Sequence, residues 1–167
     1  MDFARDMFFF SFYTRGMSFI DMAHLKKKDL QNGILSYRRR KTGQQLFIKW
    51  EKCMQEFAVK HKTDYGSPYL LPILKYPYDN RSQYKNALYR TNKNLKEVAK
   101  LAGISIPLTL YVARHSWASI AKSKNIPISV ISEGMGHDSE MTTQIYLASL
   151  DNSVVDKANT QILRELL

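Results

Sequence analysis

The sequence is poor in cysteine, in long apolar runs and in turn-forming residues. Cys53 is the single cysteine among 167 residues, which excludes an internal disulfide and a cysteine-based zinc site and is typical of a reducing cytosol. No run of about 18 apolar residues occurs, so no transmembrane helix is predicted. Asp2 and Asp6 stand where a signal peptide carries basic residues. Seven glycines and five prolines are too few for a low-complexity chain.

Acidic residues are also scarce. Fifteen Asp and Glu face 25 Lys and Arg, which gives a net charge of +10 and a pI near 9.7. The length suits one domain, and a hydrophobic fraction of 44% is enough for a packed core, which excludes a disordered chain. A basic domain of this kind predicts a polyanionic partner.

The positive charge is concentrated in one part of the chain. Residues 1–100 hold 20 basic and 9 acidic side chains, whereas residues 101–167 hold 5 and 6. A solvated face is the ordinary explanation of such a run, and a membrane surface is disfavoured because the cluster straddles a predicted hairpin. The arginine content favours the phosphate backbone of a nucleic acid. The densest stretch has seven cations in sixteen positions, namely Lys26, Lys27, Lys28, Arg38, Arg39, Arg40 and Lys41.

The hydrophobic pattern predicts a mainly α fold with a small three-stranded antiparallel β-sheet (α+β). Ser18 is placed as the N-cap of a short helix. Between residues 28 and 49 the period changes to two, with Asn32-Gly33 and Thr42-Gly43 as turns. No linker or repeat divides residues 1–167, which predicts a single domain. The expected helices cover residues 2–13, 18–25, 50–61, 82–102, 111–123, 128–135, 140–149 and 153–166, and the expected strands 28–30, 34–39 and 45–49.

Four side chains suit phosphoryl transfer without a metal ion: Arg114, His137, Tyr146 and Lys41. The sequence has no Gly-rich phosphate loop, no HExxH pair and no compact carboxylate group that would hold magnesium. Taken singly, each side chain has a structural explanation, such as a snorkelling arginine or a core tyrosine. Their order and spacing are informative together, because His137 comes 23 positions after Arg114 and Tyr146 comes 9 positions after His137.

This constellation resembles the catalytic domain of the tyrosine recombinase (phage integrase) family. The resemblance runs from about Asp2 to Ser149, and in style it is nearest to integrases of conjugative transposons and related mobile elements. The segments that carry it are Arg114-His115-Ser116, Met135-Gly136-His137, Thr142-Thr143-Gln144-Ile145-Tyr146 and Arg40-Lys41-Thr42-Gly43.

The resemblance implies a site-specific recombinase or integrase that cleaves and rejoins DNA for integration or excision of a mobile element. In this mechanism Tyr146 attacks phosphorus and forms a 3′-phosphotyrosyl bond. Arg114 and a second arginine bind the phosphate oxygens, and His137 donates a further hydrogen bond. Lys41 on the hairpin turn protonates the leaving 5′-oxygen, so no metal, ATP or other cofactor is required. The predicted contacts to the DNA backbone are Lys26, Lys27, Lys28, Arg38 and Arg40.

Two positions depart from the family pattern. The first conserved arginine of the family falls on Ser18 in this chain, and either Arg15 or Arg39 could supply the missing guanidinium. Arg39 is favoured because the hairpin must already approach the phosphate to deliver Lys41. The second departure is Tyr111, which stands where most relatives have a histidine; its hydroxyl can still donate a hydrogen bond to phosphate.

The resemblance also sets expectations about partners and organisation. It implies that the chain is a C-terminal catalytic domain without the N-terminal core-binding and arm-binding domains of full-length relatives, in a bacterial cytoplasm. It implies double-stranded DNA as partner, a homotetramer on DNA for the full-length protein and a monomer for the isolated domain. The terminal helix at 153–166 would dock either on its own domain or on a neighbouring protomer.

Two other functions stay open at this point. A type IB topoisomerase-like activity has the same chemistry, but the Thr-Thr-x-x-Tyr spacing and the small size favour the recombinase. A non-enzymatic DNA-binding module with a decayed active site would explain Ser18 and Tyr111. Plasmid relaxation distinguishes the topoisomerase, and trapping of a phosphotyrosyl adduct distinguishes the decayed module.

Overall fold

A computed structural model describes residues 1–76 and 78–148 of the chain; the expected helix at 153–166 lies outside these residues. The fold is mainly α with one small antiparallel sheet, which confirms the predicted class. Within the described residues, none of the helices has the length and apolar character needed to cross a membrane. The elements are α1 (Asp2–Tyr13), α2 (Phe19–His24), the 3-10 helix η1 (Lys27–Asp29), β1 (Leu30–Gln31), β2 (Ile34–Arg38), β3 (Gln45–Lys49), α3 (Lys52–Lys60), α4 (Asn80–Leu101), α5 (Leu110–Ser123), α6 (Ile128–Met135) and α7 (Glu140–Ala148).

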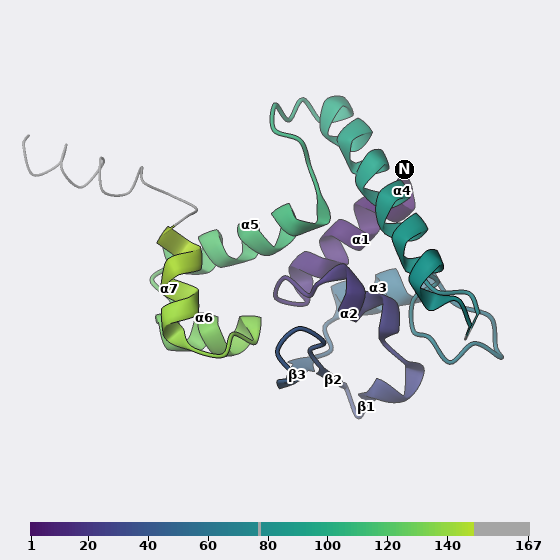
Figure 1. The fold of residues 1–167 in the computed structure, drawn as a ribbon, viewed down its shortest axis with the longest axis horizontal. Coiled ribbons are helices and arrows are strands. Elements are labelled where there is room, and N and C mark those ends of the chain that lie inside the picture. The colour runs from purple at the N-terminus through teal and green to yellow at the C-terminus, as the bar shows by residue number, and fades with distance from the viewer. Residues whose placement is uncertain (77, 149–167) are drawn as a thin grey trace, which may run out of the picture.

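Helix α1 is the centre of the main core. It contacts α3, α4 and α5 (Figure 1). Its side chains Met7 and Phe10 are fully buried. Asp6 is buried on the same helix, and its carboxylate accepts hydrogen bonds from Lys60 at 2.6 Å and from His61 at 2.8 Å. This buried carboxylate therefore joins α1 to the end of α3.

Helix α2 connects α1 to the sheet. Ser18 is its N-cap, and the Ser18 hydroxyl accepts the Asp21 N–H at 3.4 Å and donates to the Asp21 carboxylate at 2.6 Å. The other carboxylate oxygen of Asp21 accepts the Arg40 N–H at 2.9 Å. The cap of α2 thereby holds the β2–β3 hairpin in place.

The sheet has the order β1-β2-β3, with Asn32-Gly33 as the first turn. Its inner face contributes Leu35 and Ile48 to the main core, in the alternation expected of a sheet covered on one face. The expected strand at 28–30 is wrong in part, because Lys27–Asp29 forms a 3-10 helix and β1 begins at Leu30. The Asp29 carboxylate accepts the Lys26 N–H at 2.8 Å, which closes this short turn.

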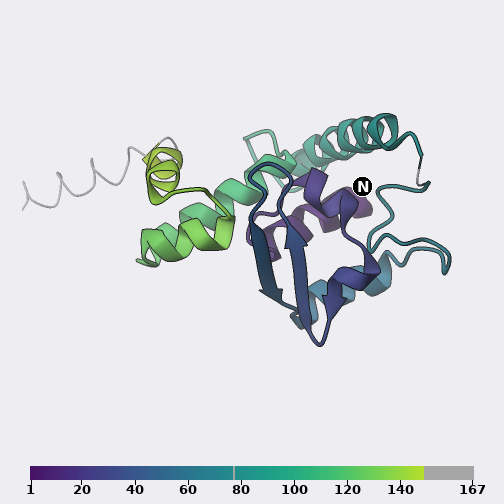
Figure 2. The same ribbon diagram turned by 60° about the horizontal axis from the view of Figure 1, so that its bottom comes forward.

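The last three helices form a second, smaller core. Ala118, Ile131, Met135 and Leu147 are buried there, with Trp117 and Tyr146 packed against them. Helix α5 runs from the α1–α4 body to α6 and α7 (Figure 1), and the turned view places the β2–β3 hairpin beside this group (Figure 2). The hairpin and the last three helices thus meet at the junction of two cores.

Candidate active site

A cavity of about 320 Å³ opens at this junction. It brings together six of the side chains singled out in the sequence, although Arg39 and Tyr146 are more than a hundred positions apart. Arg15 and Ser18 are not among its lining residues: Arg15 lies beside Gly134, and Ser18 caps α2. The cavity is lined by Arg39, Lys41, Thr42, Tyr111, Arg114, His137, Asp138, Thr142 and Tyr146.

Arg114 lies on α5 and is 6% exposed. Its guanidinium donates to the Gly16 carbonyl at 2.8 Å and to the Met135 carbonyl at 2.9 Å, which ties the end of α1 to the end of α6. The backbone of residue 16 lies so close that a Cβ there would stand 2.7 Å from the Arg114 Cγ. Glycine at this position is therefore required for the approach of α5.

Arg39 follows β2 in the hairpin and is also 6% exposed. Its backbone N–H and carbonyl pair with Gln44 and Gly43, each at 2.8 Å, and its guanidinium donates to the Gly136 carbonyl. Thr42 Oγ1 donates to the same carbonyl at 3.2 Å. Gly136 ends α6 with a φ of +62°, the left-handed conformation that favours glycine. The α6 terminus is therefore the anchor that holds the hairpin against the cavity.

The two arginines make the cavity strongly positive. Burial and the nearby Arg39 charge lower the pKa of Arg114 to about 10, so its guanidinium still carries its charge at neutral pH. Among residues 1–76 and 78–148, no carboxylate forms an ion pair with either arginine. Two buried like charges without a carboxylate partner are a preformed site for an anion.

His137 is neutral in this site. Burial lowers its pKa to about 4, and the charges of Arg114, Arg39 and Lys41 act in the same direction. An arginine N–H can only donate, so His137 Nε2 accepts from Arg114 at 3.0 Å. The ring proton is then on Nδ1, which donates to the Thr143 hydroxyl at 2.8 Å. In this state Nε2 is a proton acceptor, not the donor to phosphate that the resemblance implies.

Tyr146 lies on α7, one turn after Thr143, and its ring is half-buried. Burial and the Tyr111 hydroxyl raise its pKa above the ordinary value of 10, while Arg114 and Arg39 act in the opposite direction. The phenol is therefore protonated at neutral pH before an anion binds. The same arginines that would hold a phosphate are close enough to favour the phenolate.

Lys41 and Tyr111 complete the rim of the cavity, and both are exposed. Lys41 sits on the β2–β3 turn, where its charge contributes to the low pKa of His137. The interpretation of the sequence did not assign roles to Thr143, which contacts His137, or to His115, which contacts Tyr146. The sequence feature that could have indicated a role for Thr143 is its position one helical turn before Tyr146, on the same face of α7.

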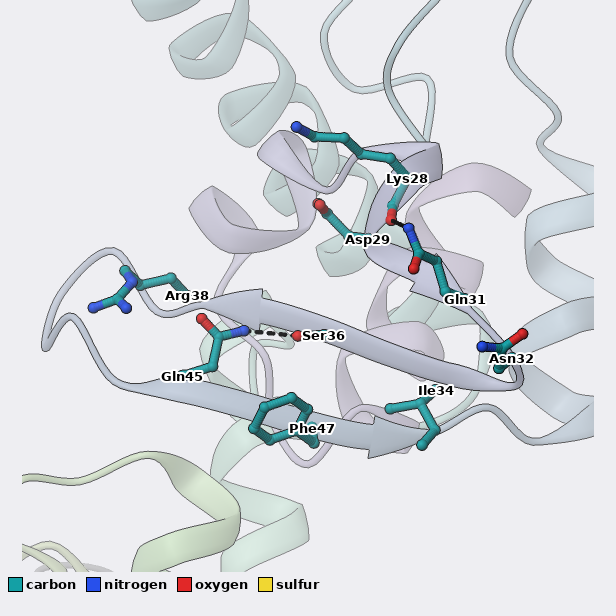
Figure 3. A pocket seen from close by; sticks show the side chains of 9 residues that line it. All are labelled: Lys28, Asp29, Gln31, Asn32, Ile34, Ser36, Arg38, Gln45 and Phe47. Carbon is teal, nitrogen blue, oxygen red and sulfur yellow. Dashed lines mark hydrogen bonds between the residues drawn. The ribbon is translucent and has the colours of Figure 1, made fainter.

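The predicted DNA-backbone residues are not among the lining residues of this cavity, although Arg38 and Arg40 are the chain neighbours of Arg39. Lys26, Lys27, Lys28, Arg38 and Arg40 are all exposed, and Lys27 Nζ donates to the Asp64 carbonyl at 2.8 Å. A shallow hollow of about 700 Å³ covers the outer face of the sheet, and Lys28 and Arg38 are among the residues that line it (Figure 3). Ile34 and Phe47 form the apolar part of this hollow, which contains none of the four predicted catalytic side chains.

Comparisons with known proteins support the family resemblance of the sequence. A family model described as the phage integrase family matches residues 7–153. The tyrosine recombinase XerA of Pyrococcus furiosus is 31% identical over 141 residues, which are 80% of this chain and 46% of that protein. The chain thus spans about half the length of this curated relative.

Solved structures show the same fold at low sequence identity. A crystal structure of XerA recombinase has a TM-score of 0.60 at 19% identity and covers 96% of this chain and 63% of its own. XerH recombinase bound to a palindromic difH substrate, in a post-cleavage complex, has a TM-score of 0.63 at 20% identity and covers 94% of this chain and 45% of its own. A lambda integrase dimer bound to a COC′ core site has a TM-score of 0.59 at 18% identity, covering 86% and 51%. With its fold, its cavity and a family match over most of its length, the chain belongs to the phage integrase family of tyrosine recombinases.

Proposed function

We propose that this chain is the catalytic domain of a site-specific recombinase that cleaves and rejoins DNA through a 3′-phosphotyrosyl bond to Tyr146. The observation that carries this proposal is the pair of buried guanidinium groups, Arg39 and Arg114, without a carboxylate partner among the described residues and beside a tyrosine hydroxyl. A phosphodiester supplies the missing negative charge, and the tyrosine supplies the nucleophile.

Each bond change and proton transfer in strand cleavage has a proposed side chain. Tyr146 Oη attacks phosphorus, the P–O5′ bond breaks, and Lys41 gives its proton to the departing 5′-oxygen. As the Arg114 N–H turns from His137 to the phosphate, neutral His137 takes the phenol proton on Nε2, and the resulting imidazolium donates a hydrogen bond to a phosphoryl oxygen. The phosphate anion makes this protonation favourable because it offsets the repulsion from Arg39 and Arg114. Rejoining is the same sequence in reverse, so the bond energy stays in the phosphotyrosine.

We assign the second phosphate-binding guanidinium to Arg39. It lines the cavity with Arg114 and contributes to the lowered pKa of Arg114, whereas Arg15 does not line the cavity. Replacing Arg39 with Gln should lower the single-turnover cleavage rate by about 10²–10³-fold, as for loss of one donor to a developing oxyanion. Arg38→Gln, on the same hairpin but exposed, should change DNA affinity and leave the rate at saturating DNA unchanged.

The exposed basic residues are proposed as contacts to the DNA backbone. Neutralising Lys26, Lys27 and Lys28 should reduce the slope of log affinity against log salt by about 0.9 for each lost contact. An unchanged slope would show that these lysines do not contact the DNA backbone and only form a solvated face. For the whole protein we propose N-terminal DNA-binding domains, a homotetramer on DNA, and integration or excision of a mobile element in a bacterial cytoplasm.

The decisive test is covalent trapping. Nicked duplexes with a randomised core and a labelled strand are incubated with the chain, and DNA that stays bound in detergent is recovered and sequenced. The wild-type chain should form an adduct that mass spectrometry locates on Tyr146, and Tyr146→Phe should form none. An adduct of equal yield with Tyr146→Phe would refute the assignment, and relaxation of plasmids without strand exchange would favour a topoisomerase-like activity.

A further inference from the structure

The ring of Tyr146 has one stacked neighbour that the proposed mechanism does not use. His115 lies parallel to it, with ring centroids 5.1 Å apart and an angle of 7° between the planes. Tyr111 and His137 meet the same ring nearly edge-on, at 89° and 70°. Parallel rings at this distance attract each other and restrict rotation, whereas an edge contact restrains only one side of a ring.

His115 is itself held in a fixed position. It follows Arg114, whose three hydrogen bonds fix the register of α5 against the ends of α1 and α6. Tyr111, one helical turn earlier, packs edge-on against the His115 ring with centroids 4.3 Å apart. The surface that faces Tyr146 is therefore rigid before any substrate binds.

The imidazole has features of a packing group more than of an acid or a base. It does not line the cavity, and burial, with the Arg114 charge, lowers its pKa below the ordinary value, so it is uncharged at neutral pH. Its Nδ1 is buried without a hydrogen-bond partner among the described residues. A buried nitrogen without a hydrogen-bond partner destabilises a fold, so hydrogen bonding does not explain a histidine at this position.

We propose that His115 is a positioning residue for the nucleophile, which holds the Tyr146 ring by stacking so that its hydroxyl stays beside Arg39 and Arg114. This inference rests on the proposed function of Tyr146. Attack on phosphorus requires an oriented hydroxyl, and a ring free to rotate about its side-chain bonds would spend less time in that orientation.

The test compares His115→Ala with His115→Phe, and uses Ser119→Ala, an exposed position on the same helix, as control. The substrate is a nicked duplex that the wild-type chain converts to the covalent adduct. His115→Ala should slow single-turnover cleavage by about tenfold at saturating DNA, with the Kd for DNA unchanged. His115→Phe should restore the rate to within about twofold of wild type, because a phenyl ring stacks as an imidazole does. Loss of activity in both variants, with DNA binding intact, would overturn the positioning role and indicate acid–base chemistry at His115.

A second measurement needs no substrate. In NMR spectra of the chain with labelled tyrosine, the ring signals of Tyr146 are identified by their absence in Tyr146→Phe. Its ring signals should move in His115→Ala, because the ring-current effect is lost, and should stay shifted in His115→Phe. Signals unchanged in His115→Ala would overturn the stack itself. Absence of an adduct with the wild-type chain would instead refute the proposed function, so the two failures are distinguishable.

Discussion

Gly136 is the point where the hairpin, α6 and the cavity meet, and Gly136→Ala tests that junction. The residue has a φ of +62°, and a Cβ there would lie 2.9 Å from Leu46 Cδ1 and 3.1 Å from Arg39 Cδ. The left-handed conformation costs an alanine about 1 kcal/mol. Moving Leu46 and Arg39 away from the new methyl group costs about 1–3 kcal/mol more, as in other overpacked sites. The free energy of unfolding should fall by about 2–4 kcal/mol in total.

Gly103 offers a matched control. Its φ is +66°, and a Cβ there would have no atom within 4 Å. Gly103→Ala therefore includes the backbone cost without the contact, and should lower the free energy of unfolding by about 1 kcal/mol. Urea unfolding measures both values, with the m-value as a check that the unfolded state is unchanged. The difference between the two variants isolates the contact of residue 136 with the hairpin.

The same pair of variants distinguishes stability from function. Gly136→Ala should reduce formation of the covalent adduct even at a temperature where the chain is folded, because displacement of Arg39 removes one of the two guanidinium groups from the cavity. Gly103→Ala should form the adduct as the wild type does. If the two variants lose equal stability and keep equal activity, the hairpin is not anchored at Gly136 and the derived geometry of the site is wrong.

Two further predictions concern titratable groups. The pKa of His137 is about 4 in the folded chain and near 6.5 when unfolded, so stability should fall as pH drops from about 6.5 towards 4, with a slope of at most about 1.4 kcal/mol per pH unit. The slope should become smaller in His137→Gln, measured by urea unfolding at a series of pH values, and a slope equal to that of the wild type would contradict the lowered pKa of His137. Burial alone would raise the pKa of Asp6, but its hydrogen bonds to Lys60, His61 and Arg5 lower it below the ordinary value. Asp6→Asn should cost about 2–4 kcal/mol at pH 7, against less than about 0.5 kcal/mol for the exposed Glu51→Gln; equal losses would show that the buried carboxylate adds no stability.

Elements defined by local chemistry were predictable. Ser18 caps α2 through its own hydroxyl, and Gly136 ends α6 in the left-handed conformation that its sequence position favours. The turn at Asn32-Gly33 depends on two residues alone. The 3-10 helix at Lys27–Asp29 was missed because part of what holds it is distant: the Lys27 N–H donates to the Pro68 carbonyl at 2.9 Å.

The sequence by itself determined the family, the fold class, and the order and spacing of Arg114, His137 and Tyr146, because these features lie within short stretches of helix and turn. Only the tertiary structure decided which side chains share the cavity. Arg39 reaches it through a contact with Gly136, 97 positions away, and Arg114 is fixed by Gly16, 98 positions away. The neutral state of His137 and the stack of His115 on Tyr146 depend on burial and on rings from different helices. Burial and distant contacts form only when the two cores pack together, so no local pattern in the chain could specify them.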